Sequence, residues 1–417
     1  MAERIFKGGE FLVTEVTCDE IFTPEEFTDE QKQIAETTEQ FVENEIVPHI
    51  DEIEDQNFDL VIEAFKKCGD LGLLMMDTPE AYGGMELDKV TSMLVAEKIA
   101  PAGGFSVAYA AHTGIGTLPL VYYGTEAQKE QYLPKLVSGE WPAAYCLTEP
   151  GSGSDALGAR ATAILSEDGT HYILNGTKQF ITNGSFAKLF IVFAKIDKEL
   201  FTAFLVEKDF EGLVIGPEEK KMGIKGSSTT QVILDNCKVP VENLLGEAGK
   251  GHKIAFNVLN VGRFKLGACV TGAAKQATLV GVKYANERKQ FNQPISSFGA
   301  IQEKIADLTA DTFAAESLVY RLAGLLDTKL ATIDREIDNY YIEYQKGIEE
   351  YATECAISKV YCSEVLARVV DEVVQIHGGY GYMHEYGLEK IMRDIKVLQL
   401  LGGSNPYHHV QIIADMK

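Results

Sequence analysis

Residues 145–155 combine hydroxyl groups and glycines in a way that suits the binding of a ligand by the main chain. Thr148 and Ser154 carry hydroxyls that both donate and accept hydrogen bonds, while Gly151 and Gly153 let the backbone approach a flat or phosphorylated group without a Cβ in the way. The stretch ends a predicted strand, where a helix-rich N-terminal part gives way to a strand-rich middle. Taken alone, an ordinary turn in a β-domain is the better interpretation.

Three further stretches change that interpretation: KQFITNG at residues 178–184, ERKQF at 287–291 and VQIHGGYGY at 374–382. Together with residues 145–155 they resemble the acyl-CoA dehydrogenase family, whose members are flavoenzymes that desaturate fatty acyl-CoA thioesters. The resemblance extends from about residue 25 to the end of the chain, in the family's order and spacing. Its nearest subfamily is the very-long-chain type, whose further C-terminal helical region has no counterpart here. A natural short form and a truncated one are both open.

The composition agrees with this resemblance and excludes some other functions. With 417 residues the chain is long enough for two or three packed domains, and its formal net charge of -24 makes nucleic-acid phosphate a poor partner. The seven cysteines show neither Cys-x-x-Cys spacing nor an even total, and the histidines show no ligand spacing. We therefore expect reduced thiols in a cytoplasmic protein and no metal site. The first residues lack an apolar signal core, and no apolar run is long enough to cross a bilayer.

The periodicity of apolar residues predicts an α+β protein with three domains. Residues 1–143 are expected to form an N-terminal α-helical domain, with a helix start at the capping-box sequence of residues 28–31. Residues 144–248 are expected to form a middle antiparallel β-barrel or sandwich domain, with Asn175-Gly176 as one of its turns. Residues 249–417 are expected to form a C-terminal four-helix bundle, with long helices at 254–286, 302–326 and 342–377.

The resemblance implies FAD as the cofactor, lying between the middle and C-terminal domains and across a subunit boundary. The flavin ring is expected to contact Tyr145, Cys146, Leu147, Thr148, Gly153, Ser154, Phe180, Ile181 and Thr182, with the hydroxyls of Thr148 and Thr182 at its polar edge. The adenosine diphosphate half, usually of the neighbouring subunit's flavin, is expected to contact Arg288, Gln290, Phe291, Gln302, Gln375, Ile376, His377, Gly378 and Gly379, and Ser404 is a further predicted contact. Arg288 suits a pyrophosphate by its charge and planar donors. A homodimer or homotetramer is therefore expected.

The resemblance also implies fatty acyl-CoA as the substrate and an electron-transfer flavoprotein as the electron acceptor. The positions that match contacts to the thioester and the CoA chain are Ser154, Asn260, Arg263 and Gly403. Ser106 and Ala110 match the deep end of the acyl pocket, where shorter-chain members carry bulkier polar residues, so a long acyl chain is preferred. Close helix packing is at least as good an interpretation of these two small residues.

The catalytic base implied by the resemblance is missing. Most members of the family place a glutamate shortly after an Arg-Asp pair, which here is Arg393-Asp394, and the matching position is Gly402. The position that other members use instead is also a glycine, Gly262. The tail departs from the family pattern as well. Where the family tends to have an amide, an apolar residue and an arginine, this chain has Pro406, Tyr407, His408 and His409.

Three interpretations of Gly402 are open at the level of the sequence. In the first, another carboxylate of the chain acts as the base. In the second, the chain is a natural or engineered form that has lost its base. In the third, the chain binds flavin and acyl-CoA and has no dehydrogenase activity. Because most motifs concern flavin and thioester binding, the leading hypothesis is an FAD-dependent acyl-CoA dehydrogenase of fatty acid β-oxidation. The alternative is a catalytically weak FAD and acyl-CoA binding protein with an assembly or regulatory role. An acyl-CoA oxidase is a third hypothesis.

Overall fold

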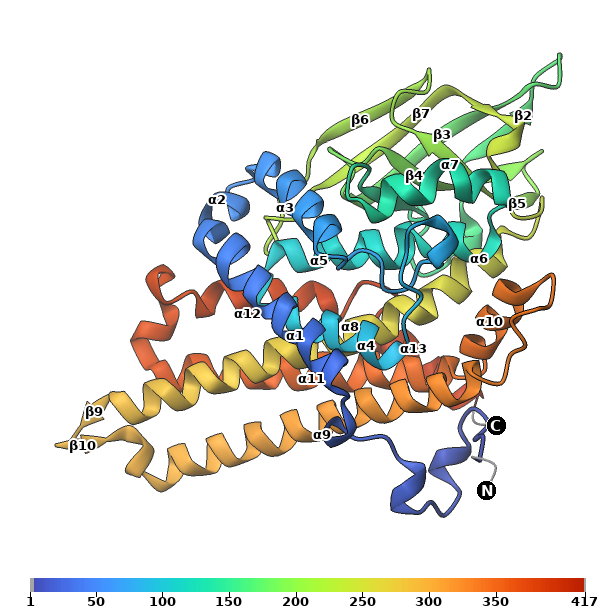
Figure 1. Ribbon diagram of the computed structural model, residues 1–417. Coiled ribbons are helices and arrows are strands. Elements are labelled where there is room, and N and C mark those ends of the chain that lie inside the picture. The colour runs from blue at the N-terminus through green and yellow to red at the C-terminus, as the bar shows by residue number, and fades with distance from the viewer. Residues whose placement is uncertain (1–3, 416–417) are drawn as a thin grey trace.

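The computed structural model describes residues 4–415 as an N-terminal helical region, a middle β-sheet and a C-terminal set of long helices (Figure 1). The sheet lies at one end of the molecule, and the long helices extend away from it beneath the N-terminal helices. This arrangement of helices, sheet and helices confirms the predicted fold class. The boundaries at residues 143/144 and 248/249 stay predictions.

The N-terminal region consists of short helices around an apolar core that includes Phe65 and Phe105. They are α1 (Asp29–Phe41), α2 (Ile50–Glu54), α3 (Phe58–Asp70), α4 (Lys89–Lys98), α5 (Gly104–Ala110), α6 (Leu118–Tyr123) and α7 (Glu126–Val137), and α5 continues into the π-helical turn η8 (Ala111–Gly116). The predicted capping box starts α1, since the Gln31 N–H donates to Thr28 Oγ1 and the Thr28 N–H donates to the Gln31 side chain.

The middle region is one connected sheet with the strand order β6-β7-β3-β2-β4-β5-β8, and β1 pairs with β4. Its strands are β1 (Ala143–Cys146), β2 (Thr162–Leu165), β3 (His171–Thr182), β4 (Leu189–Ile196), β5 (Leu200–Glu207), β6 (Leu213–Glu218), β7 (Thr229–Pro240) and β8 (Leu244–Leu245). Most neighbouring strands are antiparallel, as predicted, whereas β1 and β2 both pair with β4 in parallel. The parallel pairing of β1 places the stretch 147–155 at the edge where β1 leaves the sheet.

The predicted turn at Asn175-Gly176 is wrong. β3 continues through both residues and pairs with β7 on either side of a register shift at Gly176. A Cβ at Gly176 would approach the Ala161 Cβ to 2.7 Å, and its φ is 149°. The glycine is therefore required for close contact with the chain ahead of β2 and not for a turn.

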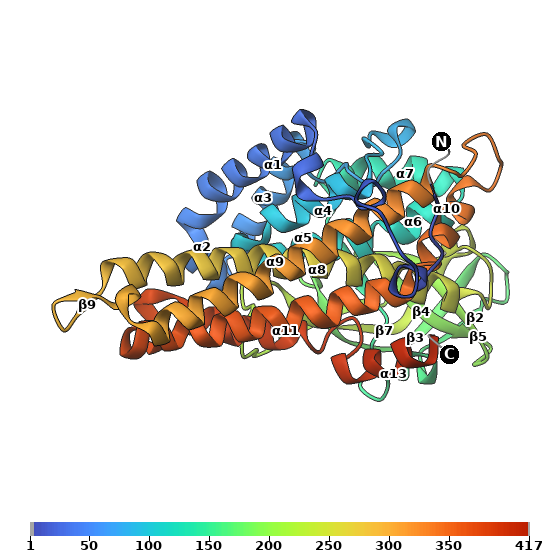
Figure 2. The same cartoon turned by 90° about the horizontal axis from the view of Figure 1, so that it is seen from below.

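In the C-terminal region the long helices α8 (Gly251–Glu287), α9 (Gly299–Leu330) and α11 (Ala352–His377) lie side by side (Figure 2). A hairpin of β9 (Lys289–Gln290) and β10 (Gln293–Pro294) joins α8 to α9, α10 (Tyr340–Glu349) precedes α11, and α12 (Leu388–Leu398) and α13 (Asn405–Asp415) pack on α11. α4 also packs against α8 and α9, so the N-terminal region contributes a helix to this bundle.

The prediction of one helix over residues 342–377 is wrong, because the chain breaks between α10 and α11. Tyr351 leaves helical geometry there, with φ of -104° and ψ of 27°. Its ring is fully buried and its hydroxyl donates to the carbonyl of Phe6 in the N-terminal segment. Of the helices that the structure describes, none combines the length and the apolar character needed to span a bilayer.

Candidate active site

Residues 145–155 lie against the end of β3, which brings two predicted ring-binding segments together. The Gln179 N–H donates to the carbonyl of Thr148 at 2.8 Å, and β3 ends at Thr182. Within residues 4–415, the hydroxyls of Thr148 and Thr182 make no hydrogen bond, although both side chains are half-buried. Two hydroxyls without internal partners, on segments that contact each other at Gln179, are suited to a ligand with a polar edge.

A buried ion pair fixes this loop. Lys178 Nζ lies 2.7 Å from Glu149 Oε1, and the two side chains are 0% and 7% exposed. The same carboxylate accepts the N–H groups of Arg160 and Ala161. Burial alone would raise the pKa of Glu149, but the Lys178 ammonium and the two N–H groups bring that pKa below its ordinary value. Lys178 and Glu149 thus hold Thr148 in place from within the sheet.

Open space surrounds the glycines of the same loop. A Cβ at Gly151 or Gly153 would meet no atom within 4 Å, so the backbone there is free to lie against a ligand. Phe180 adopts the left-handed backbone region, with φ of 58°, and its ring is 62% exposed. A non-glycine residue in that region costs roughly 1–3 kcal/mol, and such strain is typical of ligand clamps. The segment therefore fits one face of a flat ring.

The residues predicted to contact the adenosine half gather where α8 and α11 end. His377 stacks on Tyr284 with ring centroids 3.8 Å apart, and Arg288 lies over the ring of Tyr380 at 5.2 Å. A Cβ at Gly378 or Gly379 would meet nothing within 4 Å. An arginine beside exposed glycine backbone suits a phosphate group. The exposed side chains of the set are Gln290, Phe291, Gln302 and Gln375, whereas Ile376 and His377 are buried.

The two groups of predicted flavin contacts lie at opposite ends of α8. The hydroxyl of Tyr145 donates to the carbonyl of Ala255 near the start of this helix, and Arg288 caps its end. At 1.5 Å per residue the two positions are about 50 Å apart. Figure 1 shows the hairpin that follows α8 at the end of the molecule farthest from the sheet. One dinucleotide cannot reach both groups within a single chain.

The predicted base position lies in a turn between α12 and α13. Gly402 and Gly403 both have positive φ, 65° and 97°. A Cβ at Gly402 would meet only Arg263 Cγ, at 3.9 Å, whereas a Cβ at Gly403 would approach His408 Nε2 to 2.7 Å. Position 402 therefore has space for a side chain, although its left-handed φ favours glycine, and position 403 has no space. Ser404, half-buried, follows in the same turn.

Two buried cations hold this turn. Arg263 donates to the carbonyl of Gly402 at 3.0 Å and to Asn260 Oδ1 at 2.9 Å. Lys359 on α11 is fully buried and donates to the carbonyls of Gln399 and Gly403 and to Asn405 Oδ1, at 3.2, 2.9 and 2.6 Å. Among the described residues neither cation forms an ion pair.

The cost of burying these charges is visible in their pKa values. Burial, together with the charge of Arg263, lowers the pKa of Lys359 to about 8. Burial also lowers the pKa of the Arg263 guanidinium. Burial lowers the pKa of His408 to about 4, so its ring is neutral at neutral pH. Its Nε2 lies 3.0 Å from the carbonyl oxygen of Gly402. The turn is therefore positively charged, and no carboxylate contacts either cation directly among the described residues, although the charge of Glu364 partly offsets the lowering of the Lys359 pKa.

Arg263 and Asn260 also line a cavity of about 560 Å³ whose lining includes two carboxylates not predicted from the sequence, Glu349 and Glu350. Glu349 Oε2, at the end of α10, accepts a hydrogen bond from Asn257 Nδ2 at 3.2 Å. Asn257 and Gly262 are five residues apart on α8, which places them about 140° apart around the helix axis. Glu349 thus shares a cavity with Arg263 but lies on a different side of α8 from Gly262.

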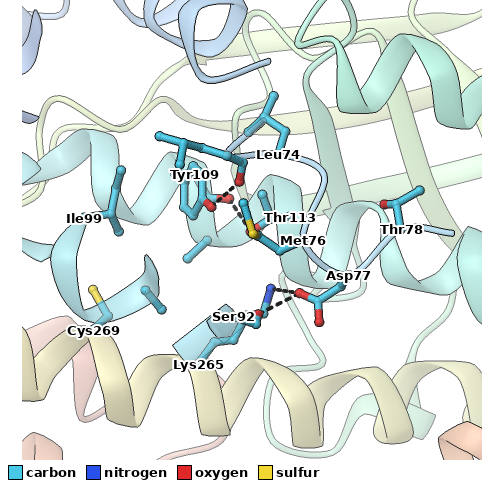
Figure 3. Close-up of a pocket in the computed structure, with 13 residues that line it drawn as sticks. Leu74, Met76, Asp77, Thr78, Ser92, Ile99, Tyr109, Thr113, Lys265 and Cys269 are labelled. Atoms are coloured by element: carbon cyan, nitrogen blue, oxygen red, sulfur yellow. Dashed lines mark hydrogen bonds and ion pairs between the residues drawn. The ribbon is translucent and has the colours of Figure 1, made fainter. Parts of the chain in front are cut away.

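The predicted acyl-pocket residues lie on α5, which runs antiparallel to α8 together with η8. A Cβ at Gly262 would meet Ile115 Cγ2 at 3.3 Å, and Cys269 Sγ lies 4.0 Å from Ser106 Oγ. Ala110 lies between these contacts and lines a small cavity with Cys269 (Figure 3). Ser154, the predicted thioester contact, is exposed on the ring-side loop. No group of His, Cys, Asp or Glu within the described part of the chain is arranged to hold a metal ion.

Comparisons with known proteins agree with this geometry. Models of the acyl-CoA dehydrogenase N-terminal, middle and C-terminal domains match residues 28–140, 144–237 and 249–416. The chain belongs to the acyl-CoA dehydrogenase family.

Among its relatives is a probable acyl-CoA dehydrogenase of Bacillus subtilis, 53% identical over 404 residues, which are 97% of this chain and 68% of the relative. The mitochondrial very long-chain specific acyl-CoA dehydrogenase of Mus musculus is 38% identical over 97% of this chain and 60% of its own length. A crystal structure of an acyl-CoA dehydrogenase complexed with FAD from Bacillus anthracis matches with a TM-score of 0.97 and 54% identity, over 99% of this chain and 71% of that one. The chain thus spans about two thirds of the length of these relatives.

Proposed function

We propose that this protein is an FAD-dependent dehydrogenase that desaturates fatty acyl-CoA thioesters between the α and β carbons, as in fatty acid β-oxidation. The single observation that carries the proposal is the contact between the open glycine loop of Thr148 and the last residues of β3, which ends at Thr182, in a chain of the acyl-CoA dehydrogenase family. When bound, FAD would supply the acceptor for the β-hydride. Thr148 and Thr182 would hold the polar edge of its ring, and the Lys178–Glu149 pair would keep Thr148 in position.

The chain's own residues can polarise a thioester but offer no proton acceptor at position 402. The Gly402 N–H makes no hydrogen bond among the described residues and is free to donate to a thioester carbonyl, beside the charges of Arg263 and Lys359. Loss of a general base lowers a rate roughly 10²- to 10⁴-fold. Glu349 does not stand at the alternative base position either, because its contact with Asn257 places it on a different side of α8 from Gly262. Binding is therefore retained better than turnover.

Each complete flavin site requires two chains. The ring-side residues and Arg288 lie at opposite ends of α8, too far apart for one dinucleotide, so the adenosine half would be held by a second copy in a homodimer or a homotetramer. Mixing a Thr182→Ala chain with an Arg288→Ala chain tests this: mixed dimers regain one intact site and bind FAD more tightly than either parent. Equal weakness of the mixture and its parents would contradict a shared site.

Further parts of the proposal concern the substrate, the electron acceptor and the location. A long acyl chain is supported by the small side chains of Ser106 and Ala110 and by the very long-chain specific relatives. An electron-transfer flavoprotein is the proposed acceptor, as the family resemblance implies. A cytoplasmic location is supported by the seven free cysteines, which suit a reducing compartment.

A catalytically weak FAD and acyl-CoA binding protein with an assembly or regulatory role is the second candidate, and the absent side chain of Gly402 favours it. Anaerobic mixing of the purified yellow protein with palmitoyl-CoA and octanoyl-CoA tests both candidates. A shift of the visible flavin band followed by bleaching supports the dehydrogenase. A shift without bleaching over hours supports the binding protein. The absence of bound flavin, or of any spectral response to acyl-CoA, would overturn both. Rapid return of the colour with oxygen would point to an oxidase.

A further inference from the structure

The stripe of α8 that begins at Gly262 leads away from the predicted base turn toward a buried ion pair. Gly262, Lys265 and Cys269 are spaced by three and four residues and therefore share one face of the helix. This face contacts the α5 and η8 segment, since Gly262 lies against Ile115 and Cys269 lies against Ser106. An acyl chain that follows α8 from the thioester toward Ser106 must pass Lys265.

The cavity at this point is narrow and polar on one side (Figure 3). Its volume is about 10 Å³, which is room for about one water molecule. Leu74, Ile99 and Ala110 form apolar parts of the lining, and Asp77 and Lys265 form a charged part. A hydrocarbon chain that reached this cavity would therefore meet an ion pair directly ahead of it.

This ion pair is firmly held. Lys265 Nζ lies 2.6 Å from Asp77 Oδ2, and the two side chains are 8% and 4% exposed. Asp77 also pairs with Lys89, which is 2% exposed, and accepts a hydrogen bond from Ser92 at 2.8 Å. Burial alone would raise the pKa of Asp77, yet the two ammonium groups hold it well below its ordinary value. The Asp77 carboxylate is therefore ionised throughout the neutral pH range.

We infer that the Asp77–Lys265 ion pair is the stop that limits how far an acyl chain extends along α8, and hence sets the longest chain that the channel accommodates. The inference rests on the proposed acyl-CoA function and adds a residue-level determinant of chain length to it. Separating a buried pair leaves an uncompensated charge, which a few additional buried methylenes do not offset. Methylenes in excess of this length find no space beyond the stop and therefore add no affinity.

Isothermal titration of the FAD-loaded protein with a series of saturated acyl-CoAs tests the inference. Affinity is expected to rise roughly fourfold for each methylene that is buried and then to reach a plateau. In Lys265→Met the plateau is expected at a longer chain, with unchanged affinity for shorter chains. Asp77 keeps Lys89 as a partner in this variant, so its charge stays compensated. Lys265→Gln, which keeps a hydrogen bond to Asp77, is the second variant and is expected to move the plateau by less.

Lys275→Met is the matched control. Lys275 lies on the same helix and forms ion pairs with Glu97 and Glu316, but does not line the cavity. Its substitution is expected to leave the plateau where it is. A plateau that is the same in the unmodified chain and in both Lys265 variants, or an affinity that rises without limit in the unmodified chain, would overturn the stop alone. Absence of acyl-CoA binding at every chain length would overturn the proposed function and the stop with it.

Discussion

The ring-side loop at residues 147–155 and the turn at residues 399–405 both project backbone toward the candidate site, yet they differ in what supports them. In the loop a buried carboxylate and a buried ammonium compensate each other, and two hydroxyls stay free for a ligand. In the turn Arg263 and Lys359 are both buried, and both donate only to neutral oxygens. The first region is complete as a binding element, whereas the second has the charges that would surround a carboxylate without the carboxylate itself. Flavin binding and proton removal are therefore separable in this chain.

The largest expected effect comes from adding a carboxylate to the turn. Gly402→Glu should raise the rate of flavin reduction by palmitoyl-CoA roughly 10²- to 10⁴-fold, because it adds a general base where only Arg263 Cγ is near. Anaerobic stopped-flow absorbance measures this rate. Gly402→Gln is the control of equal size and should give no acceleration. Equal rates for the glutamate and glutamine variants would mean that the difference between the two regions is not a missing base.

The second largest expected effect is on the free energy of unfolding, and it comes from breaking the ion pair of the ring-side loop. Lys178→Met leaves Glu149 buried without its counter-ion, and such a loss costs about 3–5 kcal/mol of folding free energy. Chemical unfolding of the flavin-free protein measures the change. Lys238→Met removes an exposed pair with Glu211 from the same sheet and should change stability by less than about 1 kcal/mol. A similar small change for both variants would show that the loop does not depend on its buried pair.

The adenosine end should contribute a smaller and purely binding effect. Arg288→Ala is expected to weaken FAD binding roughly 10- to 150-fold, since charge-assisted hydrogen bonds contribute about 1.5–3 kcal/mol. Reconstitution of the flavin-free protein with FAD, followed by fluorescence, gives the dissociation constant. Arg368→Ala, which removes an exposed pair with Asp311, is the control. Loss of affinity in both variants to the same extent would argue against a phosphate contact at Arg288.

The buried lysine of the turn should show the smallest effect and a distinctive pH dependence. Lys359→Met leaves the Gln399 and Gly403 carbonyls without their donor and should cost about 1–3 kcal/mol at neutral pH. The pKa of Lys359 is about 8 in the folded chain and 10.5 in its ordinary state. Between these values the unfolded chain binds the extra proton, so the folded state gains stability as pH rises.

The stability difference between the unmodified chain and Lys359→Met should therefore grow between pH 8 and 10.5, by up to about 1.4 kcal/mol per pH unit. Unfolding free energies at several pH values check this slope, and background titrations cancel in the comparison of the two proteins. A difference that is independent of pH would mean that Lys359 is not a strained buried charge.

Local patterns account for much of the fold but not for its long-range contacts. The capping box at Thr28 and the alternation of the strands depend on neighbouring residues, and both are visible in the sequence. The Asn175-Gly176 dipeptide predicts a turn when only its neighbours are considered. The contact that requires Gly176 is with Ala161, just ahead of β2, and the local sequence does not reveal it. The break at Tyr351 depends in the same way on a hydrogen bond to Phe6, 345 residues away in the chain.

The same distinction applies to the candidate site. Thr148, Thr182, Arg288 and Gly402 are found from motifs, because each stands at a fixed distance within a recognisable stretch. The pairing of Asp77 with Lys265 joins residues 188 positions apart, and no local pattern signals it. Lys359 occurs within a helix whose other residues are largely apolar. A charged residue in such a pattern is the sequence signal that could have indicated a buried contact.

The absence of a proton acceptor at Gly402 is tested most directly by exchange of the α-hydrogens of palmitoyl-CoA on the FAD-loaded protein in deuterium oxide. With no side chain to remove the α-proton, mass spectrometry should find deuterium at the α-carbon no faster than in palmitoyl-CoA without protein, while Gly402→Glu should accelerate the incorporation. Rapid exchange on the unmodified chain would contradict this, because it would require another residue of the site to act as the base.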